Sequence, residues 1–390
     1  ETDINLDIMK YNFDEIIARK DTYSTKWLKF TDGDVLPMWI ADMDFSCPSD
    51  ITDEMTKRIN QGIFGYTDTP PLLTETFVSK VYENTGWRIK NDWVVWIPGG
   101  VVGLNVACKT VLAPGQIAMV PSPIYAPFTE APENMERGFV KNFLLDSDGR
   151  LEFNSETIKT ILTEDTRMFF LCNPHNPGGT VFKKEEIEEI SNICQERGII
   201  VCSDEIHSDL ILEEGLDHIP FASLNNYNQE NSITIMGPCK TFNLAGFPIA
   251  AAIIPNKELR EDFVRNTKGI VAHIDNIAFV AAEAAYSKAG LWHAELIQYL
   301  KSNRQLLLER INNIEGISLR GPEAGFLAWI DCRESGMKTP AKFFIEEAKV
   351  GVHDGAWFGD ENYVRLNFGC PKSILDEALN RIEKAFSQRN

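Results

Sequence analysis

Five short stretches in the middle of the chain are almost entirely apolar, and turn-forming or amphipathic sequence separates them. They are residues 116–120, 167–172, 198–204, 232–236 and 249–254. A strand with both faces buried has this composition, whereas a strand with one face in solvent alternates apolar and polar residues. Residues 183–198 carry isoleucines at helical spacing and end at Gly198, a typical residue after a helix. Strand and helix therefore alternate, which predicts an α/β layer around a mostly parallel sheet.

The C-terminal part of the chain follows a different pattern. Residues 291–314 form one long amphipathic stretch, typical of a helix, and short apolar runs at 317–321 and 325–331 predict strands. At 390 residues the chain is long enough for two domains. We predict a large domain over residues 46–290 and a smaller α+β domain built from residues 1–45 and 291–390.

Charge and composition exclude several classes of partner. The net charge of −19 leaves no basic excess for phosphates, which argues against nucleic acids and anionic membranes as partners. No apolar run approaches the roughly 18 residues of a membrane span, and the N-terminal sequence lacks the apolar core of a signal peptide. The eight cysteines include no C-x-x-C pair and the six histidines do not cluster. We therefore predict a cytoplasmic protein with reduced thiols and no metal site.

Ligands of an open parallel sheet bind beyond the carboxyl ends of its strands, so the residues that follow each strand are candidates. Lys240 follows 232–236 and lies between apolar runs. A lone lysine in a turn is usually an exposed surface residue, and the alternative is a desolvated amine with a chemical role. Asp204 ends its strand, where a buried carboxylate is costly unless it is paired. His207, three residues on, can face the same side.

Weaker signals follow three other strands. Gly99 and Gly100 lead into a predicted helix, whose N-terminus can bind an anion. Tyr125 lies in a proline-rich loop and can either stack on a flat ring or pack at a domain edge. Asn176 can hydrogen-bond a ligand oxygen or cap the next helix. Together the candidates predict one site at one rim of the sheet.

Pyridoxal phosphate (PLP) chemistry uses an anion site, a stacking ring, an amide, a buried carboxylate and a lysine amine together. The carboxylate keeps the pyridine nitrogen protonated, so that the ring withdraws electrons from a carbanion. A free lysine amine has a pKa of roughly 10.4, so it acts as a base near neutrality only when its surroundings disfavour the charge. The apolar sequence around Lys240 meets that need. We therefore predict PLP as the cofactor.

Over essentially its whole length, the chain resembles the fold-type I PLP enzymes, the aspartate aminotransferase superfamily. The motifs are FGYT, PGGVVGLN, SPIYAPF, NPHNPGG, SDEIHSDL, GPCKTFNLAG and VRLNFGCP. LPMWIADMDF, residues 36–45, together with SDEIHSDL resembles the cystathionine β-lyase or C–S lyase branch, which includes a maltose-regulon modulator. The resemblance implies a mixed, mostly parallel seven-stranded sheet in the large domain beside a smaller α+β domain.

The resemblance also implies roles for the candidates. Lys240 is expected to bond to the cofactor and to move the Cα proton, while Asp204 pairs with the pyridinium nitrogen. Tyr125 is expected to stack on the ring. Asn176 is expected to contact the 3′ oxygen and the substrate, with His207 beside it at a position where many relatives carry tyrosine.

Further implied contacts concern the phosphate and the substrate carboxylate. Backbone amides of Gly100, Val101 and Val102 are expected to hold the phosphate. Tyr66 in FGYT is expected to reach the phosphate of a neighbouring subunit, which implies a homodimer with shared active sites. Tyr66 is therefore expected to take part in catalysis together with Lys240 and Tyr125. Arg365 in VRLNFGC is expected to bind the substrate carboxylate as a bidentate fork.

Three positions depart from the common pattern. Gly237 and Cys239 stand where many relatives carry serine, and Pro248 replaces a phosphate-binding arginine. Phosphate contacts are therefore expected from the backbone and Tyr66 more than from charged side chains.

The predicted activity is that of a C–S β-lyase, which converts a cystathionine- or cysteine-type amino acid to a thiol, pyruvate and ammonia. An aminotransferase of the same fold is one alternative, because the candidate residues alone do not separate the two reactions. A regulatory protein with incidental lyase activity is the other.

Overall fold

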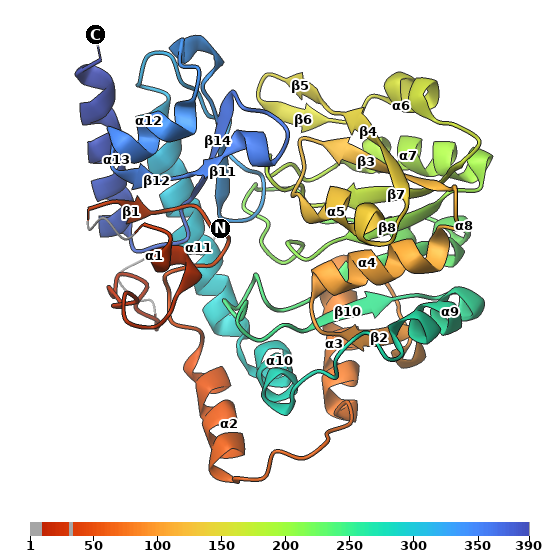
Figure 1. The fold of residues 1–390 in the computed structure, drawn as a ribbon. Helices are drawn as coiled ribbons and strands as arrows, with labels where there is room; N and C mark the ends of the chain where they lie inside the picture. The colour runs from red at the N-terminus through yellow and green to blue at the C-terminus, as the bar shows by residue number, and fades with distance from the viewer. Residues whose placement is uncertain (1–9, 31–33, 390) are drawn as a thin grey trace.

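A large seven-stranded sheet organises the computed structural model, which describes residues 10–30 and 34–389 (Figure 1). The strand order is β2-β10-β9-β8-β7-β3-β4. Its strands are β2 (Val94–Ile97), β3 (Ile117–Ser122), β4 (Gly138–Phe143), β7 (Thr166–Cys172), β8 (Ile200–Asp204), β9 (Ser232–Met236) and β10 (Ala250–Ile253). Only β10 runs antiparallel to its neighbours within this sheet. The predicted α/β fold with a mixed, mostly parallel sheet is confirmed.

Helices cover both faces of the large sheet. One face packs against α4 (Gly100–Val111), α5 (Pro127–Asn134) and α9 (Lys257–Thr267). The other face packs against α3 (Pro71–Thr85), α6 (Ser155–Ile161), α7 (Lys184–Arg197) and α10 (Asn276–Lys288), and α8 (Asn226–Glu230) contacts α7. Successive β7 residues alternate between the two cores, because side chains of a strand point to opposite faces. Helices shield both faces of the sheet from solvent, which explains why its strands are apolar along their whole length.

A second, smaller group of elements lies beside the sheet (Figure 1). Its antiparallel sheet has the order β11-β14-β13, and β1 pairs in parallel with β12. Its strands are β1 (Leu36–Pro37), β11 (Leu327–Asp331), β12 (Val350–Gly351), β13 (His353–Asp354) and β14 (Tyr363–Asn367). Its helices are α1 (Thr25–Leu28), α11 (Gly290–Ile311), α12 (Pro340–Glu346) and α13 (Lys372–Ser387). The helix α2 (Ser49–Asn60) packs on α10, and β5 (Leu145–Ser147) and β6 (Arg150–Glu152) form a hairpin.

One expected strand is wrong. Residues 317–321 form no strand, and pairing is limited to an isolated bridge from Ser318 to Asp331. The side chain of Asn312 donates to the Leu319 carbonyl and accepts from the Leu319 N–H, both at 2.8 Å, so these backbone groups are not free for a ladder. The division into residues 46–290 and the two flanking parts stays a prediction, and residues 1–9 lie outside the described residues.

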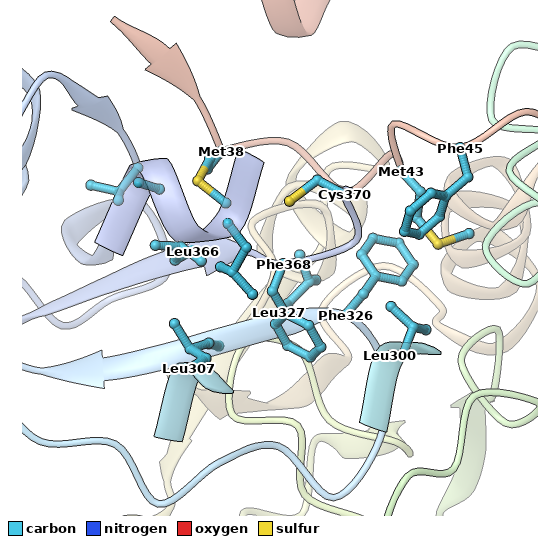
Figure 2. Packing of buried hydrophobic residues seen from close by; sticks show 14 of the residues in the cluster. Met38, Met43, Phe45, Leu300, Leu307, Phe326, Leu327, Leu366, Phe368 and Cys370 are labelled. Carbon is cyan, nitrogen blue, oxygen red and sulfur yellow. The ribbon is translucent and has the colours of Figure 1, made fainter. Parts of the chain in front are cut away.

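Residues 38–45, which we call the strap, bring the N-terminal region into the small sheet's core (Figure 2). Met38, Met43 and Phe45 are buried at 1%, 1% and 5% exposure. They belong to one hydrophobic cluster with residues of β11, β14 and α11, and with Phe326 just before β11 and Phe368 just after β14. Burial of these side chains holds the strap against the C-terminal part of the chain.

Other sequence expectations concern thiols, metals and membranes. All eight cysteines are free thiols, and all but Cys47 are buried. Within residues 10–30 and 34–389, no group of three or more His, Cys, Asp or Glu side chains is arranged to hold a metal ion. No helix in the same ranges is long and apolar enough to cross a membrane.

Phe368 should be a key contact of this core, since it is fully buried between the strap, Phe326 and α11. We expect Phe368→Ala to lower the free energy of unfolding by about 3–5 kcal/mol, as measured by chemical denaturation. The matched control is Phe143→Ala, whose ring is 64% exposed on the edge strand β4 and should change stability by less than roughly 0.5 kcal/mol. Equal effects of the two substitutions would contradict this account of the core.

Candidate active site

A cavity of about 470 Å³ lies beyond the carboxyl ends of the large sheet's parallel strands. Nine predicted site residues line it: Gly100, Val101, Val102, Tyr125, Asn176, Asp204, His207, Lys240 and Arg365. All but Arg365 follow or end one of the strands β2, β3, β7, β8 and β9, which run in the same direction. Arg365 arrives from β14 of the small sheet. The structure therefore brings these nine residues together, while their chemical roles stay predictions.

The amine of Lys240 faces the strap. Its Nζ atom donates a hydrogen bond to the Ala41 carbonyl at 2.9 Å. The side chain keeps some surface toward the cavity, but protein surrounds the amine, and this burial lowers the pKa of Lys240. A larger fraction of neutral amine is therefore present near neutral pH than in a free lysine.

Asp204 is a buried carboxylate at the end of β8. It is 9% exposed, and its Oδ1 accepts a hydrogen bond from the Ile206 N–H at 3.1 Å. No ion pair to Asp204 forms within the described part of the chain. Burial raises the pKa of Asp204 from 3.8 to about 6. A cationic N–H of a ligand would relieve this desolvation cost.

The neighbouring Glu205 keeps the β8 loop in place. Its fully buried carboxylate accepts hydrogen bonds from the Ser203 hydroxyl at 2.7 Å and the Phe221 N–H at 3.1 Å, and it lies 2.7 Å from His218 Nε2. Because adjacent residues of an extended segment point to opposite sides, this network leaves Asp204 directed at the cavity.

Arg365 is 2% exposed and forms no ion pair with a carboxylate of the described residues. Its Nη1 donates to Asn176 Oδ1 at 2.9 Å, its Nη2 donates to the Trp39 carbonyl at 2.9 Å, and Nη2 lies 3.2 Å from His353 Nδ1. Its Nε has no hydrogen-bond partner among the residues that the structure describes. Burial lowers the pKa of Arg365, and this buried cation is suited to a ligand carboxylate.

His207 and Tyr125 complete the inner wall. His207 is 7% exposed, and burial together with the charges of Lys240 and Arg365 lowers its pKa to about 3, so the ring is neutral. The Tyr125 N–H donates to the Asn176 carbonyl at 3.2 Å, which joins the β3 and β7 loops. Burial raises the pKa of Tyr125, so its hydroxyl stays protonated.

The helix α4 presents its N-terminus to the cavity. It begins at Gly100, and no side chain caps it. The N–H groups of its first turn have no intrahelical acceptors and carry the positive end of the helix dipole. Gly99 before it has a φ of 100°, a conformation that glycine adopts without strain. Local geometry therefore matches the anion site predicted at Gly100, Val101 and Val102.

The three positions that depart from the common pattern lie in or beside the cavity wall, and their surroundings differ. A Cβ atom at Gly237 would lie 3.0 Å from the Ile249 carbonyl oxygen and 3.2 Å from Ala250 Cα, so little room exists for serine. The Cys239 thiol donates to the Ile249 carbonyl at 3.2 Å and is thus turned toward the backbone. Pro248 borders the cavity 3.5 Å from the position of a Cβ on Gly99.

Tyr66 does not line the cavity of its own chain. It lies in the exposed connection between α2 and α3, is fully exposed, and has its ring centroid 6.4 Å from that of His273. Figure 1 shows this connection along the lower edge of the molecule. Its predicted contact with a neighbouring subunit stays a prediction.

The sequence did not predict that the strap forms a wall of the cavity and holds the site residues. Its carbonyl groups accept hydrogen bonds from Lys240 and Arg365, as described above, and also from Asn243 and Asn367. The motif LPMWIADMDF covers this segment, but it offers no periodicity or charged group that predicts a cavity wall.

A group of aromatic rings on the outer side of the cavity was also missed. Trp39 of the strap, His353 of β13 and Trp357 in the turn after it all line the cavity. In the sequence none of these residues follows a predicted strand of the large sheet, so only the tertiary structure brings them to the site.

Comparison with known proteins agrees with this fold and site. The model of the family "Aminotransferase class I and II" matches residues 34–382. The chain therefore belongs to the aminotransferase class I and II family.

Individual relatives are similar over their whole lengths. The chain is 36% identical to cystathionine beta-lyase PatB of Bacillus subtilis (strain 168), covering 96% of this chain and 100% of that protein. The crystal structure of OvoB superposes with a TM-score of 0.94 at 40% identity, covering 97% and 99% of the two chains. Cystalysin from Treponema denticola, whose crystal structure contains PLP, has a TM-score of 0.94 at 29% identity and covers 98% and 100%. The predicted family is confirmed.

The buried Asp204 carboxyl should make the stability of the cofactor-free protein depend on pH. Because its pKa is raised to about 6 in the folded state, its contribution is most favourable below about pH 4 and is lost as the pH rises through 6. Asp204→Asn should therefore gain about 2 kcal/mol of unfolding free energy relative to wild type between pH 4 and pH 7. The measurement is denaturant unfolding at both pH values.

Asp165→Asn, which changes an exposed aspartate in the turn before β7, is the control and should follow wild type. A pH-independent difference between Asp204→Asn and wild type would show that the Asp204 carboxyl does not titrate as described.

Proposed function

We propose that this protein is a PLP-dependent C–S β-lyase that cleaves cystathionine- or cysteine-type amino acids to a thiol, pyruvate and ammonia. The observation that carries the proposal is the meeting, in one cavity, of the Lys240 amine with the Asp204 carboxylate and the Arg365 guanidinium, neither of which forms an ion pair within the described residues. The relative named cystathionine beta-lyase and the PLP in cystalysin support the same reaction class and cofactor.

The residues of the cavity fit PLP. Asp204 lacks a cationic partner among the described residues and would accept the pyridinium N–H. Tyr125 offers an aromatic ring, and the uncapped N-terminus of α4 offers N–H groups for the phosphate. His207 and the amide nitrogen of Asn176 would meet the 3′ oxygen. When bound, PLP supplies an electron sink that stabilises negative charge at the substrate Cα atom.

The chain's own residues then bind the substrate and move its proton. Arg365, held by Asn176 Oδ1 and the Trp39 carbonyl, would bind the substrate carboxylate and so orient the Cα–H bond. The lowered pKa of Lys240 suits its amine to remove the Cα proton. Loss of that proton and departure of the sulfur with its electron pair together constitute β-elimination.

An aminotransferase would use the same binding residues and differ in the fate of the proton. Lys240 would then return the proton to the cofactor rather than allow a leaving group to depart. The cystathionine beta-lyase named above is similar to this chain over its full length, so the aminotransferase and regulatory alternatives have less support.

We also propose that the active protein is a homodimer. The connection between α2 and α3 carries exposed apolar side chains, namely Ile63 at 72%, Phe64 at 59% and Tyr66. Such a group of exposed apolar residues is typical of a surface that another chain covers. In the dimer Tyr66 would reach the phosphate in the neighbouring subunit.

Purified protein supplied with PLP should release thiol and pyruvate in equal amounts from L-cystathionine. The parallel reaction contains the same amino acid with 2-oxoglutarate and is analysed for glutamate. β-Elimination removes the amino group as ammonia, so we expect glutamate to stay at background. Glutamate without thiol would instead establish the aminotransferase.

Shared active sites can be tested by mixing two impaired subunits. Lys240→Ala should lower kcat by at least roughly 10³-fold, because the base is lost, and Tyr66→Ala should weaken PLP binding. Random mixing makes half of the dimers hybrid, and each hybrid contains one site with both native residues. We therefore expect about a quarter of wild-type activity after co-refolding.

Neither variant should regain activity when refolded alone. A mixture that stays inactive although light scattering shows dimers would exclude a shared site.

A further inference from the structure

We propose that Trp39, His353 and Trp357 form the binding wall for the sulfur substituent of the substrate, and that this wall selects substituents ending in a flat aromatic ring. The inference rests on the proposed function, because it names the substrate class of the same C–S lyase site. These residues were absent from the candidates that the sequence analysis identified.

The three rings form one continuous surface. The His353 and Trp357 rings are stacked, with centroids 4.7 Å apart and an interplanar angle of 27°. Trp39 meets His353 edge-on at 5.4 Å and 85°, and Trp357 lies 5.4 Å from the ring of Tyr125. Aromatic rings that surround a cavity favour another ring, because stacked and edge-to-face pairs are attractive beyond their buried area.

The position of this wall relative to Arg365 connects it to the substrate side chain. Arg365 Nη2 contacts both the Trp39 carbonyl and His353 Nδ1. An amino acid whose carboxylate binds Arg365 is therefore next to the wall, and its atoms beyond Cβ meet the rings. At the other end, Trp357 contacts Tyr125, the ring proposed to stack on the cofactor. The wall thus extends from the carboxylate site to the cofactor site.

The wall is apolar and incompletely covered. Trp357 is 40% exposed despite its size, so a ring that covers it removes apolar surface from water. Burial and the charges of Arg365 and Lys29 lower the pKa of His353 to about 3, so its ring is neutral. Because Arg365 donates to Nδ1, the ring proton of His353 is on Nε2.

An ammonium group on the substituent finds little compensation within this cavity, and the nearby Lys29 is itself a cation, with its Nζ 3.8 Å from the centroid of the Trp39 ring. The sulfur substituent of cystathionine ends in an ammonium and a carboxylate. Within the described residues the cavity's carboxylates are Asp42 and Asp204. Asp42 already pairs with Arg19 at 2.9 Å and with Lys26 at 3.9 Å, and Asp204 is proposed to bind the cofactor. The ammonium would thus lose water without gaining a free carboxylate, a cost that an uncharged ring avoids.

The reaction itself balances for any such substituent R. The amino acid R–S–CH2–CH(NH3⁺)–COO⁻ and one water give R–SH, pyruvate and ammonium. The Cβ–S bond breaks with its electron pair on sulfur, the Cα proton is removed, and the thiolate is protonated. No oxidant or reductant is required.

A pair of substrates separates ring stacking from simple bulk. S-benzyl-L-cysteine and S-cyclohexylmethyl-L-cysteine have the same number of carbons and the same CH2 group next to sulfur, but one ring is flat and the other puckered. With PLP-loaded enzyme we expect kcat/KM to favour the benzyl substrate about tenfold. Trp357→Leu should reduce this preference to about twofold or less, and Trp357→Phe should retain most of it.

Tyr82→Leu provides the matched control, because Tyr82 on α3 is 43% exposed and lies outside the cavity. It should keep the wild-type preference. Equal kcat/KM values for the two substrates in wild type, or a preference that survives Trp357→Leu, would overturn the inference. L-Cysteine, whose sulfide leaving group carries no substituent, tests the lyase function separately from the binding wall. Absence of pyruvate from all three substrates would contradict the proposed lyase function itself.

Discussion

Hydrogen bonds to the carbonyl groups of the strap, residues 38–45, hold the active site together. Arg365 and Asn367 donate to it from β14, while Lys240 and Asn243 donate from the loop that follows β9. The same segment thereby sets the distance between the lysine of the large sheet and the arginine of the small one. Its side chains Met38, Met43 and Phe45 are buried in the core of Figure 2, so displacing the strap would break polar and hydrophobic contacts together.

The cavity contains charges that the described chain does not pair internally. Asp204 and Arg365 are nine-tenths or more buried, yet neither forms an ion pair, and the Lys240 amine is shielded from solvent. Leaving charged groups in this state costs free energy. A cofactor with a cationic ring nitrogen would pair with Asp204, and its aldehyde would bond to the Lys240 amine. The carboxylate of an amino acid substrate would pair with Arg365. These buried charges make the free protein less stable, as is common at sites whose groups bind a ligand and transfer protons.

Sequence reasoning succeeded where chemistry depends on the end of a strand. Lys240 and Asp204 follow apolar runs, and the parallel arrangement of those runs carries both residues to one rim. It failed at residues 317–321, where a side chain of Asn312 occupies the backbone groups that a strand would use. It also missed His353 and Trp357, because no local pattern relates a short edge strand of the small sheet to a cavity of the large one.

By itself, the sequence determined the layered α/β architecture and the residues at the rim of the large sheet, because hydrophobic period and strand-end position are local properties of the chain. The family followed from the resemblance of its motifs. The tertiary structure alone decided which carbonyl receives the Lys240 amine and which aromatic rings line the cavity. These features arise where segments hundreds of residues apart come into contact, and such contacts depend on the packing of the whole core rather than on any local pattern.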